Sequence, residues 1–109
     1  MAKTFRLEVV SPEAIVWSGE AEMLVTRTTE GEIGILADHE PMMAALATGS
    51  SVITDDHGRE ITVATHGGFL QVFQNSVTLL TDRAELAEGD REAARQLAEG
   101  MAAEEREGR

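Results

Sequence analysis

Hydrophobic and polar residues alternate in short runs along most of the chain. In residues 4–10, Phe5, Leu7 and Val9 fall on one side of an extended segment, and Arg6 and Glu8 fall on the other. This period of two is typical of a β-strand with one buried face. Residues 20–27 and 61–65 alternate in the same way, and short apolar runs at residues 15–17, 33–36, 52–53, 69–73 and 77–81 also predict strands. Strands that recur about every eight to twelve residues predict a β-sandwich or a β-barrel.

Turn residues divide these strands. Ser18-Gly19 is expected to stop the second strand, and Asp55-Asp56-His57-Gly58 indicates a β-hairpin. His66-Gly67-Gly68 predicts a place where the chain bends tightly or passes close to another backbone, because glycine alone allows both. Residues 37–49, which contain Pro41 and Gly49, are expected to form a loop with a helical turn.

The pattern changes after Asp82. Residues 84–109 contain no β-branched or aromatic residue, and their Ala, Glu, Arg and Leu favour a helix. Gly89 is expected to end the β part and Asp90 to cap a helix. The sequence up to residue 109 leaves room there for one short helix and not for a long helical hairpin. The predicted organisation is therefore mainly β, with a β-sandwich domain at residues 1–86 and a short C-terminal α-helix in residues 87–109. One face of that helix carries Ala93, Ala94, Leu97, Ala98 and Met101.

Composition narrows the class of protein. A chain of 109 residues with 42% hydrophobic residues is expected to form one modest core. The formal net charge of -11 makes nucleic acid and anionic lipid surfaces poor partners. The sequence has no cysteine, which excludes disulfides and thiolate metal sites. No apolar run is long enough to span a bilayer, and the N-terminus has no signal-peptide core, so we expect a cytosolic protein that can still dock on a membrane complex.

Each candidate for catalysis has a simpler structural explanation. His39, between Asp38 and Glu40, could act as a general base. The chain offers neither a cysteine nor a Gly-x-Ser-x-Gly elbow as its nucleophile, so we interpret His39 as a loop or interface residue. Glu30 and Glu32 could be a glycosidase pair, but a turn position predicts solvent-facing carboxylates, and no aromatic platform for a sugar is evident.

Metal binding is disfavoured in the same way. Asp55, Asp56 and His57 are potential ligands, but Asp is ordinary turn chemistry and no second cluster lies at ligand spacing. The sequence also lacks a phosphate-binding Gly-x-x-x-x-Gly-Lys-Ser/Thr motif. From the residues alone we expect no catalytic site, no metal and no cofactor, which indicates an interaction subunit.

Several motifs, in their order and spacing, resemble the epsilon-chain family of the F-type ATP synthase. The strongest match is Glu30-Gly31-Glu32-Ile33-Gly34-Ile35-Leu36 followed by His39 and Pro41, although Met42 stands where the family usually has Leu. Together the matches cover about residues 5–88. The others are Val9-Val10-Ser11, Trp17-Ser18-Gly19, Gly67-Gly68-Phe69-Leu70-Gln71-Val72 and Val77-Thr78-Leu79-Leu80.

This resemblance implies a fold, a function and partners. It implies a ten-stranded β-sandwich that is a non-catalytic part of the rotating central stalk and couples c-ring rotation to ATP synthesis in the catalytic head. The implied location is the cytoplasmic side of the plasma membrane, as a peripheral part of the synthase. The implied partners are the gamma subunit, the c-subunit ring and, through the C-terminal helix, the beta subunits. In the family the acidic turn faces the c ring, which assigns Glu32 and Glu30 to that contact, and the loop histidine lies against gamma, which assigns His39.

The C-terminal segment departs from the family pattern. Many members carry a two-helix hairpin that inhibits ATP hydrolysis, and some bind ATP through an (I/L)-D-x-x-R-A motif at its start. The corresponding segment here begins at Gly89, and only Asp90 and Ala94 match that motif. We therefore expect weak or absent nucleotide binding and a reduced or absent inhibitory role. The alternative from another class is a stand-alone β-domain adaptor or binding module outside the synthase.

Overall fold

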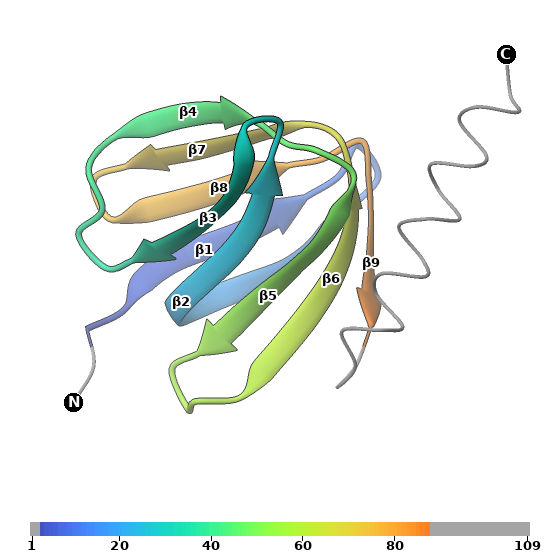
Figure 1. The fold of residues 1–109 in the computed structure, drawn as a ribbon. Coiled ribbons are helices and arrows are strands. Elements are labelled where there is room, and N and C mark those ends of the chain that lie inside the picture. Colours follow the sequence, from blue (N-terminus) through green and yellow to red (C-terminus); the bar gives the residue numbers. More distant parts are fainter. Residues whose placement is uncertain (1–2, 88–109) are drawn as a thin grey trace, which may run out of the picture.

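The computed structural model describes residues 3–87, which form one continuous β-sheet that folds back on itself (Figure 1). In that part of the chain there are nine strands. They are β1 (Phe5–Val10), β2 (Ile15–Thr28), β3 (Gly31–Leu36), β4 (Met42–Ala45), β5 (Gly49–Asp55), β6 (Glu60–His66), β7 (Phe69–Phe73), β8 (Ser76–Leu80) and β9 (Arg83–Ala87). The mainly β architecture predicted from alternation is therefore confirmed.

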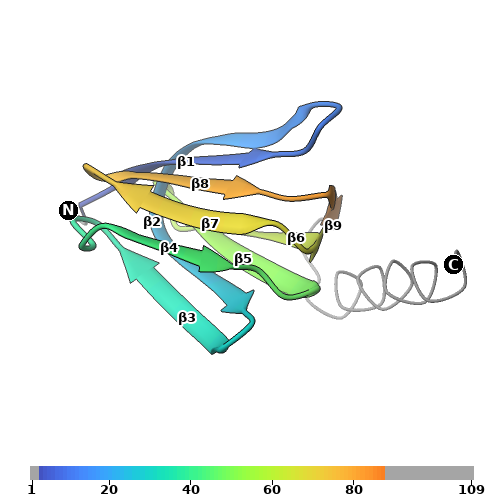
Figure 2. The same cartoon turned by 90° about the horizontal axis from the view of Figure 1, so that it is seen from above.

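The strands are arranged in two layers (Figures 1 and 2). The order along the sheet is β4-β7-β8-β1-β2-β5-β6-β9, and β3 pairs with β2 beside this path. One layer contains β4, β7, β8, β1 and the first half of β2, and the other contains the second half of β2 with β3, β5, β6 and β9. Neighbouring strands are antiparallel except β1 and β8, which are parallel.

The core lies between the two layers. In β1, β7 and β8 alternate residues point inward, and these are apolar positions of the sequence. In β5 and β6 consecutive residues are buried, among them Ser51, Val52 and Ile53. The buried apolar side chains of this core are Phe5, Leu7, Val9, Ala21, Leu24, Ile35, Leu46, Ile53, Val63, Leu70, Val72, Val77 and Leu79.

Strand β2 is longer than the sequence predicts. Residues 15–28 form one strand, so the expected stop at Ser18-Gly19 is wrong, and residues 3–87 contain nine strands instead of the implied ten. A Cβ atom on Gly19 would lie 3.1 Å from the ring of Trp17. Gly19 therefore makes room for the indole two residues earlier on the same face, without ending the strand.

Two other strands, β4 and β9, could not be recognised from their amino-acid composition. Residues 42–45 were expected to lie in a loop with a helical turn, and this expectation is wrong. Residues 84–87 have a composition that favours a helix, although the sandwich domain was expected to extend to residue 86, and they form β9. β4 pairs with β7 and β9 pairs with β6, so partners distant in sequence override the helical preference of Met, Ala and Leu. The predicted C-terminal helix, with Asp90 and Ala94, lies outside the described residues.

The glycine pair before β7 confirms a predicted close approach. Gly67 and Gly68 both have positive φ angles, 63° and 106°. A Cβ atom on Gly68 would overlap the carbonyl oxygen of Leu80 and lie 2.7 Å from the Cα atom of Thr81. The start of β7 and the end of β8 are therefore in backbone contact. Among residues 3–87, no helix has the length and hydropathy needed to cross a membrane.

Candidate interaction site

The acidic turn joins β2 to β3 at one end of the sandwich. Gly31 has a φ angle of 125°, which disfavours any residue with a side chain. The Thr28 hydroxyl accepts the backbone N–H of Glu30 at 3.2 Å and donates to the carbonyl of Gly31 at 2.8 Å. These hydrogen bonds restrain the backbone of the turn, and the side chains of Glu30 and Glu32 on it are exposed to solvent.

Backbone hydrogen bonds also join this turn to the segment between β4 and β5. The N–H of Thr29 donates to the carbonyl of Ala45, and the N–H of Ala47 donates to the carbonyl of Arg27, each at 3.0 Å. Arg27 and Glu32 are cross-strand partners, but the Arg27 side chain lies along Gly49. Within residues 3–87 neither Glu30 nor Glu32 forms an ion pair. Both carboxylates are therefore available to a basic or polar partner.

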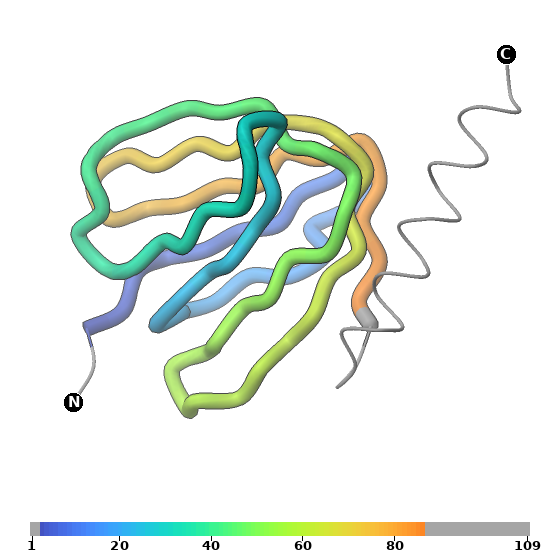
Figure 3. Tube along the Cα trace, in the orientation of Figure 1, coloured from blue at the N-terminus to red at the C-terminus, as the bar shows by residue number. Residues whose placement is uncertain are grey.

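The histidine loop, residues 37–41, follows β3 at the opposite end. β3 has six residues, so the acidic turn and this loop are about 20 Å apart at about 3.3 Å per residue. Figure 3 shows the chain passing from the turn along β3 to the loop. The sequence motif that contains Glu30, Glu32 and His39 thus supplies two surfaces that are separated by the length of a strand.

His39 is partly buried within its loop. Its Nδ1 lies 2.8 Å from the carbonyl oxygen of Glu40. Because a carbonyl only accepts hydrogen bonds, Nδ1 carries a proton in this contact. The other ring nitrogen, Nε2, takes no part in this contact and is left for a polar group of a partner.

An apolar surface covers the outside of the layer that contains β7, β8 and β1. Phe69 pairs with Leu80, Leu80 pairs with Val10, and Val10 pairs with Ile15, so the four side chains form a row across neighbouring strands. Phe69 is 53% exposed, Leu80 46% and Ile15 61%. We call this surface the outer patch. It consists of the exposed Ile15, Phe69 and Leu80 and the half-buried Val10, while Met43 and Phe73 are further exposed apolar side chains of the same layer.

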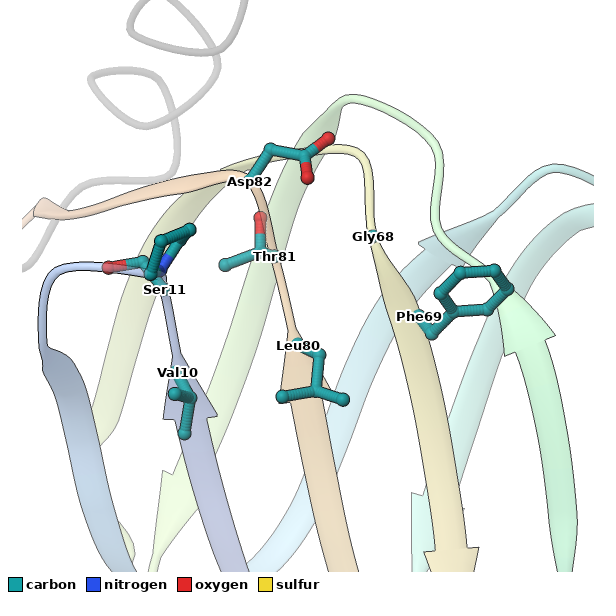
Figure 4. A pocket seen from close by; sticks show the side chains of 8 residues that line it. Val10, Ser11, Gly68, Phe69, Leu80, Thr81 and Asp82 are labelled. Atoms are coloured by element: carbon teal, nitrogen blue, oxygen red, sulfur yellow. The ribbon is translucent and has the colours of Figure 1, made fainter.

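The outer patch borders a pocket of about 460 Å³ (Figure 4). Val10, Leu80 and Phe69 supply its apolar part from three adjacent strands, and Thr81 and Asp82 lie at its polar end. Exposed apolar surface that is contiguous and edged by polar groups is typical of a protein–protein contact. The sequence analysis did not identify the outer patch. The sequence offers one local indication of it: Phe69 and Leu80 are apolar residues at positions of β7 and β8 that face the solvent, where polar residues are expected.

The candidate metal ligands are used by their own hairpin. The Asp55 carboxylate accepts the backbone N–H groups of His57 at 2.8 Å and Arg59 at 2.9 Å, and lies 3.1 Å from the Arg59 Nε atom. The backbone N–H of Arg59 is the main cause that holds the pKa of Asp55 below its ordinary value, and burial opposes it. In the described part of the chain no three His, Asp or Glu side chains gather as a metal site.

These features define a class of protein. A β-sandwich that presents an apolar patch and a separate acidic turn is typical of a domain that docks in a larger assembly. Residues 4–87 match the family described as "ATP synthase, Delta/Epsilon chain, beta-sandwich domain". The chain belongs to this family of ATP synthase epsilon chains, and the resemblance expected from its motifs is confirmed.

Curated relatives support the same family. The "ATP synthase epsilon chain" of Streptomyces avermitilis is 39% identical over an alignment of 112 positions, which covers 97% of this chain and 90% of the relative. That of Frankia casuarinae is 44% identical over 81 residues, which cover 74% of this chain and 95% of the relative. That of Rhodococcus opacus is 46% identical over 91 residues, which cover 82% and 75%.

Solved structures share the fold. A chain of the Euglena gracilis mitochondrial ATP synthase, from a structure titled OSCP/F1/c-ring, superposes with a TM-score of 0.73 and 28% identity. The match covers 91% of this chain and 64% of that one, so this chain spans just under two thirds of the Euglena chain. A chain from the Tetrahymena thermophila central stalk and c ring has a TM-score of 0.62 at 13% identity, a likeness of fold alone.

Proposed function

We propose that this chain is the non-catalytic central-stalk subunit that joins the gamma subunit to the c ring in an F-type, proton-transporting ATP synthase. In this role it couples rotation of the c ring to ATP synthesis in the catalytic head. The observation that carries the proposal is the placement of two exposed surfaces of different character on one sandwich. The outer patch is apolar, and the turn with Glu30 and Glu32 is acidic.

The outer patch and the histidine loop are the proposed contact with gamma. Phe73 lies at the end of β7, next to the turn that contacts the histidine loop, and Met43 follows the loop on β4. The hydrogen bond from the Asp38 N–H to Asn75 thus places the end of β7 beside the histidine loop. Apolar area at the centre with polar groups at the rim is the usual composition of a stable interface.

The acidic turn is the proposed contact with the c ring. Glu32 and Glu30 are exposed carboxylates on a turn whose backbone is hydrogen-bonded at its base. Charge on a rigid support can align with polar or basic loops of a partner and contributes orientation and association rate more than affinity. The proposed location is peripheral, on the cytoplasmic side of the plasma membrane, as part of the complex.

For the C-terminal segment we propose weak nucleotide binding and little inhibition of hydrolysis. The support is chemical: Gly89 and Ala93 stand where the nucleotide-binding motif has an apolar residue and Arg, and only Asp90 and Ala94 match. Any contact of this segment with the beta subunits concerns residues outside the described part. Removal of residues 89–109 should leave ATP hydrolysis by the reconstituted head unchanged, whereas a higher rate would show that the segment inhibits.

The first experiment measures binding of the full chain to purified gamma and, separately, to the c ring. Wild type, His39→Ala and Glu32→Lys form a matched set, because each variant changes one proposed surface and leaves the other intact. His39→Ala should weaken binding to gamma and not to the c ring, and Glu32→Lys should do the opposite. Failure of the wild-type chain to bind gamma at micromolar concentration would overturn the proposal and favour an adaptor outside the synthase.

A further inference from the structure

Asn75 occupies a turn that contacts the start of the chain and the histidine loop. Phe73 pairs with Ser76, so Gln74 and Asn75 form a two-residue connection between β7 and β8. Their φ angles are 49° and 59°, the left-handed values of a tight hairpin turn. Either residue could be glycine without strain, so the turn alone does not require the Asn75 side chain.

The side chain of Asn75 joins two segments that are distant in sequence. Its Nδ2 donates to the carbonyl of Thr4 at 2.9 Å, and its Oδ1 accepts the N–H of Asp38 at 2.8 Å. The backbone carbonyl of Asn75 also accepts the N–H of Arg6 at 3.1 Å. One partner is a carbonyl and the other an N–H, so the amide has one orientation that satisfies both.

Asp38 is the residue whose backbone this amide holds. It has a φ angle of 63°, a conformation that non-glycine residues adopt uncommonly. The Asp38 side chain is also 3.1 Å from the Lys3 Nζ atom, but both side chains of that ion pair are exposed, at 60% and 81%, and such pairs contribute little. The hydrogen bond from the Asp38 N–H to Asn75 is therefore the stronger restraint on this residue.

We infer that Asn75 is a positioning residue that presets the histidine loop for docking. It acts through Asp38 on the residue that follows, His39, and so fixes where the imidazole is presented. The inference rests on the proposed contact between His39 and gamma. A loop that is already ordered loses little conformational entropy when it binds. Loss of the Asn75 hydrogen bonds should therefore weaken the complex even though every atom that contacts gamma is still present.

The test compares Asn75→Gly with Gln74→Gly in the full chain. Glycine keeps the turn at both positions, and only Asn75→Gly removes the two side-chain hydrogen bonds. Asn75→Gly should speed amide hydrogen exchange at Asp38 and raise the dissociation constant for gamma about tenfold. Gln74→Gly should change each by less than about twofold, within the range of ordinary surface substitutions.

A double variant separates positioning from general weakening. In the His39→Ala background, Asn75→Gly should reduce the affinity for gamma much less than it does in the wild type, because the imidazole that Asn75 positions has been removed. Equal costs in both backgrounds, or unchanged exchange at Asp38, would overturn the inference and leave the proposed function standing. If wild type does not bind gamma, the proposed function fails, and the inference fails with it.

Discussion

The hydroxyl groups of Thr26 and Ser51 lie 2.7 Å apart between β2 and β5, in the interior of the protein. The two residues are 1% and 0% exposed. One hydroxyl therefore donates a hydrogen bond to the other where water does not reach. This pair links two strands of a layer that also buries other polar side chains, such as Thr28 and Asp55.

Removal of one member of this pair should cost more than removal of both. Thr26→Val keeps the shape of the side chain but leaves the Ser51 hydroxyl buried without a partner, at a cost of about 1–3 kcal/mol. Adding Ser51→Ala should recover part of the lost free energy of unfolding, measured in urea. Strictly additive losses would show that the two hydroxyls do not depend on each other.

Gly68→Ala should be among the most destabilising single substitutions in the described part of the chain. The new methyl group would overlap the backbone of Leu80, and the φ angle of 106° is itself unfavourable for alanine. Backbone overlap cannot be relieved by a rotamer change, so we expect a loss of about 3 kcal/mol or more.

Gly58→Ala is the matched control for that substitution. Gly58 also has a positive φ angle, 78°, but no atom lies within 4 Å of its added Cβ. It should lose only about 1 kcal/mol, the cost of the conformation alone. Similar midpoints of denaturant unfolding for the two variants would contradict the role of the contact between Gly68 and Leu80.

Asp55 should make stability depend on pH in acid. Its pKa is lowered in the folded state, below the ordinary value of 3.8, first by the N–H of Arg59. A lowered pKa stabilises the fold above pH 3.8, and this contribution is lost as the pH falls through the folded-state value. Asp55→Asn should therefore reduce stability at pH 7 and flatten the acid limb of a plot of unfolding free energy against pH.

Arg59→Met tests which group lowers that pKa. The variant removes the guanidinium but keeps the backbone N–H groups of residues 57 and 59, which donate to the carboxylate. Most of the acid dependence should remain. A flat acid limb in Arg59→Met would show instead that the guanidinium is the main cause.

The outer patch can be tested with two leucines of similar exposure. Leu80 is 46% exposed within the patch, and Leu86 is 43% exposed on β9, where it pairs with Val63. Leu80→Gln should weaken binding to gamma by about tenfold or more, as expected for a residue near the centre of an interface. Leu86→Gln should leave that affinity within about twofold, as for a residue outside the interface. Equal losses would show that the patch is not the contact.

Much of the sandwich could be predicted from the sequence, because apolar residues mark the buried positions of a strand without reference to its partners. β1 and β6 appear as alternating runs, and β3, β7 and β8 appear as short runs rich in apolar residues between turn residues. β4 and β9 could not be predicted in this way, because Met-Met-Ala-Ala and Arg-Ala-Glu-Leu-Ala carry no β preference. These segments become strands only through pairing with β7 and β6, and a local pattern does not contain its distant partner.

The residues of the candidate site also fall into those that the sequence predicts and those that only the fold brings together. Glu30, Glu32 and His39 could be identified because they lie in one continuous motif. The outer patch could not, because Val10, Phe69 and Leu80 come together only when β1, β8 and β7 lie side by side. The role inferred for Asn75 also depends on contacts across more than thirty positions, as in its bond to Asp38, with a sequence separation of 37.

The uninterrupted course of β2 has a mechanical consequence. Its first half pairs with β1, and its second half pairs with β3 and β5, so one strand belongs to both layers. A pull on the acidic turn acts along the axis of β2, where covalent bonds resist extension. The load then passes into β1 by shear across a row of hydrogen bonds, which must break together. Relative sliding of the two layers is thus opposed by the chain itself, and not by side-chain packing alone.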